Sequence, residues 1–155
     1  MIDVKVIFLD IDGVLNSARF DREKEDPEQN IDVSRLVFLK ELIDKTGALV
    51  VLSSTWRKNW DKKEGGIGEK GKKMVDTFTS EGIEIYDKTG SLSYVERSEE
   101  IKIWLSEHPD VEKFVIFDDE FFRWGDLSDN LVHIKNGIGR GLDREHIEKA
   151  MEILK

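Results

Sequence analysis

The sequence predicts an α/β fold in which a mostly parallel, five-stranded sheet lies between two layers of helices. Short apolar runs rich in β-branched residues alternate with helical stretches, which is the order of elements in such a sheet. Three of these runs end in polar clusters, as expected where a buried strand reaches the edge of a sheet. The chain has 155 residues, of which 39% are hydrophobic, so we expect one domain over residues 1–155.

The strongest strand signals share one pattern, an apolar run followed by polar side chains. The runs cover residues 4–9, 48–52 and 114–117, and are followed by Asp10-Ile11-Asp12-Gly13, Ser53-Ser54-Thr55 and Asp118-Asp119-Glu120. Weaker strands are expected at residues 83–86 and 131–134. Because parallel strands end at the same edge of a sheet, the polar clusters should converge there.

Helix signals fill the intervals between the strands. Helices are expected over residues 34–43, from near Ser98 to a point before Pro109, and after Asp143. Asn30 or Asp32 would cap the first helix, and Gly47 would end it in a left-handed conformation.

Two polar stretches are interpreted as loops. Residues 17–30 are almost entirely polar. Residues 58–73 contain six lysines, three acidic residues and four glycines, which gives a local charge of +3. A solvated, flexible loop is a simpler interpretation of this second stretch than a substrate groove.

Composition excludes several classes of function. With 24 basic and 33 acidic residues the formal charge is −9, which argues against nucleic-acid binding by the whole surface. The absence of cysteine excludes disulfides, thiolate metal sites and cysteine nucleophiles, and agrees with a cytoplasmic location. The longest apolar runs fall far short of the roughly 20 residues of a membrane-spanning helix, so no membrane contact is expected.

Asp10 and Asp12 are the candidate chemical centre. Two residues apart on an extended chain, their side chains lie on the same side and can address one group. Such a pair suits covalent phosphoryl transfer, in which one carboxylate attacks phosphorus and the other moves protons. Mg²⁺ would offset the repulsion between anions, with Asp118 or Asp119 as a further ligand. The competing interpretation is that these acids are solvated or cap the following helices.

The run from Phe8 to Asn16, Phe-Leu-Asp-Ile-Asp-Gly-Val-Leu-Asn, resembles the first motif of the haloacid dehalogenase-like (HAD) phosphohydrolases. The resemblance implies a Rossmann-like, three-layer HAD core with Mg²⁺ as cofactor. It also implies that Asp10 is the nucleophile, that Asp12 is the general acid and base, and that Asp10 and the Asp12 carbonyl bind the metal.

The later motifs are looser. Ser53 is similar to the hydroxyl residue of the second motif, which binds the transferring phosphoryl group, and Ser54 could substitute for it. For the third motif, where the family usually has lysine, Arg97 stands at the helix start and Lys102 lies about one turn further on, and we favour Arg97. Val115 to Asp119 resembles the double-Asp fourth motif, in which Asp119 is the expected direct ligand and Asp118 its support.

Several strings resemble a small HAD branch associated with RNA-repair proteins of the Swiss-army-knife type. They are Ser53-Ser54-Thr55-Trp56-Arg57, the Glu99 to Leu105 helix, the double Asp, and Gly141-Leu142. Residues 17–30 and 58–94 are too short for a large cap domain, so the resemblance implies an open site. An open site favours a macromolecular substrate, such as a polynucleotide phosphate end, which Arg57 could contact by charge and Trp56 by stacking. Core packing is an equally good interpretation of Trp56.

The sequence therefore predicts a magnesium-dependent phosphomonoester hydrolase acting through an aspartyl-phosphate on a phosphorylated substrate. The alternative is a non-catalytic magnesium- or phosphate-binding regulatory or interaction module. Retention of Asp12 favours turnover, because a phosphate store gains nothing from a general base. The glycine-rich run from Gly137 to Gly141 lacks the lysine and hydroxyl of a nucleotide-binding P-loop and is interpreted as a turn.

Overall fold

The computed structural model describes residues 4–16, 31–91, 95–121, 123–135 and 140–155. Its main sheet has five strands in the order β5-β2-β1-β6-β7. Their bounds are β1 Val4–Leu9, β2 Leu49–Leu52, β5 Ile85–Lys88, β6 Val111–Asp118 and β7 Leu131–His133. All neighbouring pairs in this sheet are parallel, which confirms the predicted α/β architecture.

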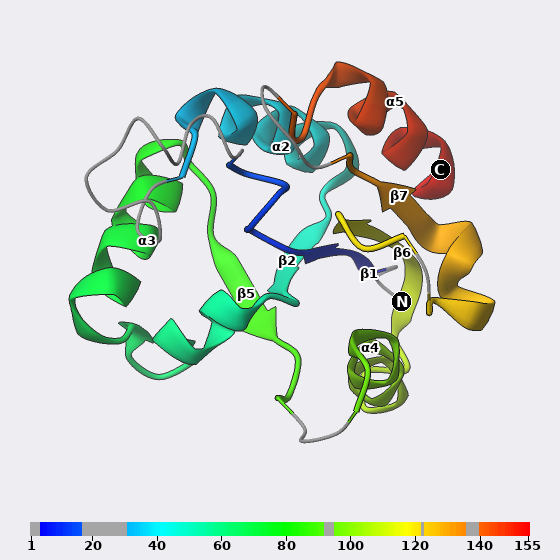
Figure 1. Ribbon diagram of the computed structural model, residues 1–155, viewed down its shortest axis with the longest axis horizontal. Helices are drawn as coiled ribbons and strands as arrows, with labels where there is room; N and C mark the ends of the chain where they lie inside the picture. Colours follow the sequence, from blue (N-terminus) through cyan, green and yellow to red (C-terminus); the bar gives the residue numbers. More distant parts are fainter. Residues whose placement is uncertain (1–3, 17–30, 92–94, 122, 136–139) are drawn as a thin grey trace.

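Helices cover both faces of the sheet (Figure 1). They are α2 Val33–Thr46, α3 Gly68–Ser80, α4 Arg97–Ser106 and α5 Arg144–Ile153, with the 3₁₀ helices η2 Thr55–Asn59 and η3 Gly125–Asn130. In Figure 1, α2 and α5 lie on one side of the strands and α4 on the other. The sheet therefore forms the middle layer, as the sequence predicts.

Alternation along β1 explains this layering. Ile7 and Leu9 belong to a core cluster that contains the buried hydrophobic side chains of α2, α3 and α5. Val6 and Phe8 belong to a second cluster, with Ile101 of α4. Because successive side chains of a strand point to opposite faces, one wholly apolar strand supplies both cores.

The predicted helix ends are confirmed at α2 and α5. Asp32 caps α2 by accepting a hydrogen bond from the Ser34 backbone, and Gly47 ends the helix at φ 72°. The other candidate cap, Asn30, lies outside the described residues. Asp143 caps α5 in a capping box with His146, whose ring accepts a hydrogen bond from the Asp143 backbone. These signals are local, and so they are readable from the sequence.

Two expected elements differ in part from the structure. The strand predicted at residues 83–86 begins at Ile85, because the Ile83 backbone bonds to the Phe78 carbonyl and still belongs to the turn after α3. The stretch 58–73, interpreted as a flexible loop, contains the hairpin of β3 (Trp60–Asp61) and β4 (Gly65–Gly66) and the start of α3. Met74 and Phe78 bury the apolar face of α3, and this burial offsets the poor helix propensity of its glycines.

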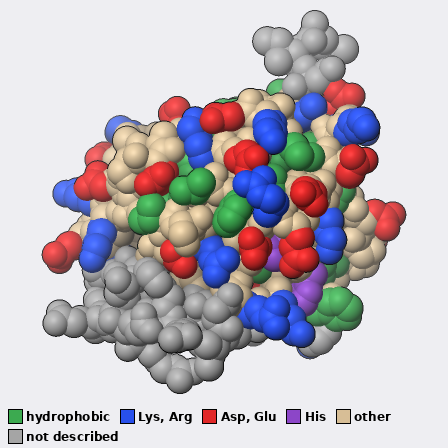
Figure 2. All heavy atoms as spheres, turned by 90° about the horizontal axis from the view of Figure 1, so that it is seen from above, with side chains coloured by type: hydrophobic (Ala, Val, Ile, Leu, Met, Phe, Trp, Pro, Cys, Tyr) green, Lys and Arg blue, Asp and Glu red, His purple; other side chains and the backbone are tan. Residues whose placement is uncertain are grey.

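The surface mixes charges of both signs. Figure 2 looks at the molecule from the side of α2 and α5, and acidic and basic side chains are interspersed over the described part of this face. Among the described residues, no helix has the length and the apolar character needed to span a membrane. The proposed loop 17–30 and residues 137–139 of the turn predicted from Gly137 to Gly141 lie outside the described residues.

Candidate active site

Backbone hydrogen bonds bring three polar clusters to one edge of the sheet. The Asp10 N–H donates to the Phe117 carbonyl of β6 at 3.0 Å, and the Ser53 N–H donates to the Leu9 carbonyl of β1 at 2.9 Å. Asp118 is the last residue of β6. The predicted convergence at the carboxyl edge therefore holds for the ends of β1, β2 and β6.

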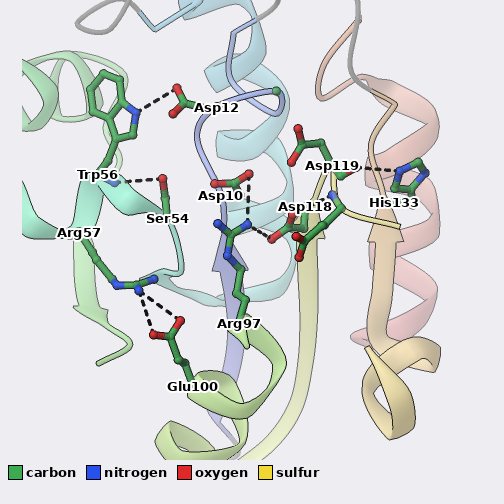
Figure 3. Close-up of polar contacts among 12 residues, drawn as sticks. Asp10, Asp12, Ser54, Trp56, Arg57, Arg97, Glu100, Asp118, Asp119 and His133 are labelled. Carbon is green, nitrogen blue, oxygen red and sulfur yellow. Dashed lines mark hydrogen bonds and ion pairs between the residues drawn. The ribbon is translucent and has the colours of Figure 1, made fainter. Parts of the chain in front are cut away.

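Three carboxylates form the centre of this edge (Figure 3). Asp10, Asp118 and Asp119 each offer an oxygen, and these oxygens all lie within 4.8 Å of one another. Asp10 and Asp118 are buried, whereas Asp119 is partly exposed. Arg97, at the start of α4, reaches this cluster: its Nη1 lies 2.6 Å from an Asp118 oxygen and 3.6 Å from an Asp10 oxygen.

The electrostatics of the cluster follow from burial and proximity. Burial raises the pKa of Asp10 well above its usual value, Asp118 raises it further, and Arg97 opposes the rise. Burial also raises the pKa of Asp118, against the lowering effect of Arg97. Burial lowers the pKa of Arg97, but the Asp10 and Asp118 charges outweigh this effect and the net pKa lies above its ordinary value. The cluster thus holds three carboxylates, two of them beside the Arg97 guanidinium, an arrangement that a bound cation would stabilise.

Asp12 lies beside the cluster and is held by two donors. The indole Nε1 of Trp56 donates to Asp12 Oδ1 at 3.0 Å, and Asn16 Nδ2 donates to the same oxygen at 3.3 Å. Within the described part of the chain, Oδ2 of Asp12 accepts no hydrogen bond. The side chain is exposed and points away from Arg97 in Figure 3, so Asp12 and Arg97 flank Asp10 on different sides.

Gly13 is required at its position by close packing. Its φ is 84°, a left-handed conformation, and a Cβ there would overlap the Asp119 carboxylate. Asn16 accepts a hydrogen bond from the Gly13 N–H at 3.0 Å, which closes the turn after β1. The glycine therefore allows the turn that follows β1 to approach the end of β6.

The two serines after β2 have different surroundings. Ser53 is 1% exposed, and its hydroxyl oxygen is buried with no hydrogen-bond partner in the described structure. An orphaned hydroxyl at this edge is suited to a ligand oxygen. Ser54 is fully buried and caps η2, where its hydroxyl accepts a hydrogen bond from the Trp56 N–H at 3.2 Å.

The other basic residues proposed from the sequence lie further from the cluster. Arg57 forms a buried ion pair with Glu100 of α4, in which Nη2 contacts both carboxylate oxygens at 3.0 and 3.1 Å. Lys102 contacts Asp126 and Glu99 at the surface. Of the two third-motif candidates, the structure brings Arg97 to the carboxylates and Lys102 to these surface acids.

Several cavities adjoin one another along this edge, among them the following. The central cavity, of about 350 Å³, is lined by Asp10, Asp12, Thr55, Arg97, Asp119 and Glu120. A cavity of about 500 Å³ shares Arg97 and Glu120 with it and is also lined by Arg57 and Arg123. A third, of about 180 Å³, shares Asp12 and Thr55 with it and is also lined by Trp56, Lys58 and Lys70.

The donor set fits Mg²⁺. Carboxylate oxygens are the ligands that this hard cation prefers, and Asp10 and Asp119 both line the central cavity. Asp118 is engaged by Arg97 and by the Glu120 N–H, so its carboxylate is already oriented by the protein. These residues can therefore hold a divalent cation.

The comparison with known families decides what kind of domain carries this cluster. The sequence profile of the family described as the HAD domain in Swiss Army Knife RNA repair proteins matches residues 6–147. The chain belongs to this HAD family. The matched range runs from β1 into α5 and includes every residue of the acidic cluster. No match to a curated protein or to a solved structure was found for this HAD domain.

Sequence reasoning left some of the site unassigned. The roles of Trp56 and Asn16 beside Asp12 depend on side-chain hydrogen bonds, one of them 44 positions apart in the chain. The Arg57–Glu100 ion pair joins η2 to α4. The sequence does not indicate which of its many acidic residues is the partner of Arg57. The position of Trp56 directly after the second motif is the sequence feature that points to this part of the site. The sequence alone favours neither stacking on a substrate nor core packing as its role.

Proposed function

We propose that this HAD domain is a magnesium-dependent phosphomonoester hydrolase that forms an aspartyl-phosphate on Asp10. The observation that carries the proposal is the cluster of Asp10, Asp118 and Asp119 with Arg97 at the carboxyl edge of a HAD sheet. In the first step an Asp10 oxygen attacks phosphorus, the bond from phosphorus to the leaving oxygen breaks, and Asp12 gives that oxygen its proton.

The second step regenerates the enzyme. Asp12, now a carboxylate, takes a proton from water, the water oxygen attacks phosphorus, and the bond between phosphorus and Asp10 breaks to release phosphate. Arg97 and the Ser53 hydroxyl would donate to the phosphoryl oxygens. Asp10, Asp119 and the Asp12 carbonyl would hold Mg²⁺, with Asp118 as support. When bound, this cation supplies positive charge that offsets the repulsion between nucleophile and phosphate.

The first experiment is hydrolysis of p-nitrophenyl phosphate with Mg²⁺ and with EDTA. We expect turnover with Mg²⁺ alone and none in Asp10→Asn, because an amide oxygen is too weak a nucleophile. Asp44→Asn, which removes an exposed carboxylate of α2, is the matched control and should keep full activity. Undiminished activity in Asp10→Asn would contradict the nucleophile assignment. Stable phosphorylation of Asp10 without turnover would favour the non-catalytic alternative.

The substrate we propose is the phosphate end of a polynucleotide. Two features support it: the family is named for RNA repair proteins, and the central cavity continues into neighbouring cavities instead of ending in a closed pocket. Remote contacts to a long substrate would supply binding energy that a small ester cannot. Oligonucleotides phosphorylated at either end should therefore exceed mononucleotides in kcat/KM. Equal or higher kcat/KM on mononucleotides would return the function to metabolite dephosphorylation.

A further inference from the structure

His133, the last residue of β7, contacts the backbone of a proposed metal ligand. Its Nε2 lies 3.0 Å from the Asp119 carbonyl oxygen. A carbonyl oxygen can only accept a hydrogen bond, so Nε2 carries the proton and donates it. We propose that His133 is a positioning residue, which directs the Asp119 carboxylate into the metal site by holding the backbone that carries it. This inference rests on the proposed function, because it takes Asp119 as a ligand of Mg²⁺.

The end of β6 explains why Asp119 needs such a contact. The Phe117 carbonyl accepts a hydrogen bond from the β1 side, and the Asp118 carbonyl accepts one from the Ile134 N–H on the β7 side. Successive carbonyls of a strand alternate in this way, so a continued strand would turn the next carbonyl back toward β1. The Asp119 carbonyl instead meets His133 of β7. The chain therefore bends out of the sheet at Asp119, and an imidazole supplies a hydrogen bond at this bend.

The two adjacent aspartates are held in different ways. The carboxylate of Asp118 is itself engaged, by Arg97 at 2.6 Å and by the Glu120 N–H at 2.9 Å. The carboxylate of Asp119 lies against Gly13 and lines the central cavity. The carbonyl and the side chain of Asp119 leave the same Cα, so a contact that fixes the carbonyl also limits the direction of the carboxylate. Such support behind a ligand is a usual part of a metal site.

The imidazole is packed from the same bend that it contacts. The Phe121 ring lies edge-on to the His133 ring, with ring centres 5.0 Å apart and an angle of 72° between the planes. In Figure 3 the imidazole reaches Asp119 from the side of β7, and the carboxylate lies on the opposite side, toward Asp10. Loss of the Nε2 donor should therefore loosen the proposed ligand without removing any ligand atom.

The test measures the affinity of the full chain for Mn²⁺, by electron paramagnetic resonance of the free ion and without substrate. Mn²⁺ takes the same oxygen ligands as Mg²⁺. His133→Phe keeps a ring against Phe121 and removes the donor. We expect about tenfold weaker binding, at the lower end for contacts that support a ligand, because His133 holds the backbone and not the carboxylate. His133→Gln places an amide nitrogen near the position of Nε2 and should restore most of the affinity.

A double-mutant cycle tests whether the effect acts through Asp119. In the Asp119→Ala background there is no carboxylate to direct, so His133→Phe should cause no further loss. His108→Phe is the matched control, because Nδ1 of His108 contacts the Trp104 carbonyl at 2.7 Å and its ring stacks on Trp104. The same substitution there removes a comparable contact and should leave Mn²⁺ affinity unchanged. Thermal unfolding checks that each variant is folded.

Three results would overturn the positioning role. They are wild-type affinity in His133→Phe, an affinity in His133→Gln as low as in His133→Phe, and equal losses with and without the Asp119 carboxylate. Should His133→Phe not fold, His133→Asn takes its place, because its shorter amide does not reach the carbonyl.

The outcomes separate this inference from the function beneath it. Hydrolysis that needs Mg²⁺ and Asp10 would leave the hydrolase proposal standing even if the positioning role fails. If the cycle behaves as expected and no phosphomonoester is hydrolysed, the positioning role stands and the hydrolase proposal fails. A wild-type protein that binds no Mn²⁺ would overturn the positioning role and the metal site together.

Discussion

At the scale of single residues, Trp56 orients the carboxylate of Asp12. Its N–H holds the Asp12 carboxylate at 3.0 Å, so Trp56→Phe should leave Asp12 present but poorly oriented. Propoxide is a poor leaving group, so propyl phosphate needs a proton from Asp12 as its bond to phosphorus breaks. For this ester we expect kcat/KM to fall about tenfold, which is less than the full effect of losing a general acid. For p-nitrophenyl phosphate the fall should be much smaller, because nitrophenolate departs without a proton.

The difference between the two esters distinguishes a loss of Asp12 orientation from a general disturbance of the active site. Titration with Mg²⁺ and thermal unfolding provide the controls, and Mg²⁺ affinity should stay at the wild-type level because Trp56 contacts none of the carboxylates of the acidic cluster in the described structure. An equal loss on both esters would argue that Trp56 acts through packing alone.

The two adjacent aspartates should differ in their effect on the metal. Asp118 is fully buried and is engaged by Arg97 and the Glu120 N–H, whereas Asp119 is partly exposed and lines the central cavity. Asp119→Ala should therefore weaken Mg²⁺ binding by about tenfold or more, and by more than Asp118→Ala. Calorimetric titration with Mg²⁺ measures both. The reverse order would assign the direct contact to Asp118.

At the scale of elements, the Arg57–Glu100 pair joins two pieces of the site. Arg57 follows Trp56 on η2, and Glu100 lies one turn after Arg97 on α4. Both partners are largely buried. The ion pair therefore fixes the element that carries the Asp12 donor relative to the element that carries the cation of the acidic cluster.

Removing one partner should destabilise the fold. Glu100→Gln leaves the Arg57 charge buried without a carboxylate, and we expect a loss of about 3 kcal/mol in the free energy of unfolding. Lys40→Gln breaks the exposed Lys40–Asp44 pair of α2 and should cost less than about 0.5 kcal/mol. Urea denaturation measures both variants. Equal and small losses would mean that the Arg57–Glu100 pair is not a structural tie.

Some helices and strands could be predicted from local sequence, and others depend on tertiary packing. β1, β2 and β6 could be predicted because each contains an apolar run that ends in polar residues, and α2 because its caps are local. A helix and a strand were expected within residues 58–94, but the position of α3 could not be predicted, since its lysines and glycines suggest a loop and its apolar face is visible only against the core. Tertiary packing overrides local propensity there.

At the scale of the whole molecule, the site is a product of the sheet topology. Because β1 lies between β2 and β6, their carboxyl ends bring Ser53, Asp10 and Asp118 to one edge. The convergence at one edge could be predicted, because parallel strands share that edge, whereas the order of the strands is known from the structure. Which cation faces the acids, and which side chain orients Asp12, depends on how η2 and α4 pack over that edge, and only the folded chain reveals it.

The central claim is that Asp10 becomes covalently phosphorylated during turnover. The most direct measurement is acid quenching of the enzyme during hydrolysis of a phosphomonoester with Mg²⁺, followed by proteolysis and mass spectrometry. We predict a hydroxylamine-sensitive phosphoryl group on the peptide that contains Asp10, present only during turnover and absent in Asp10→Asn. Turnover at an undiminished rate with the phosphoryl group on another residue, or with inversion of configuration at phosphorus, would contradict the account.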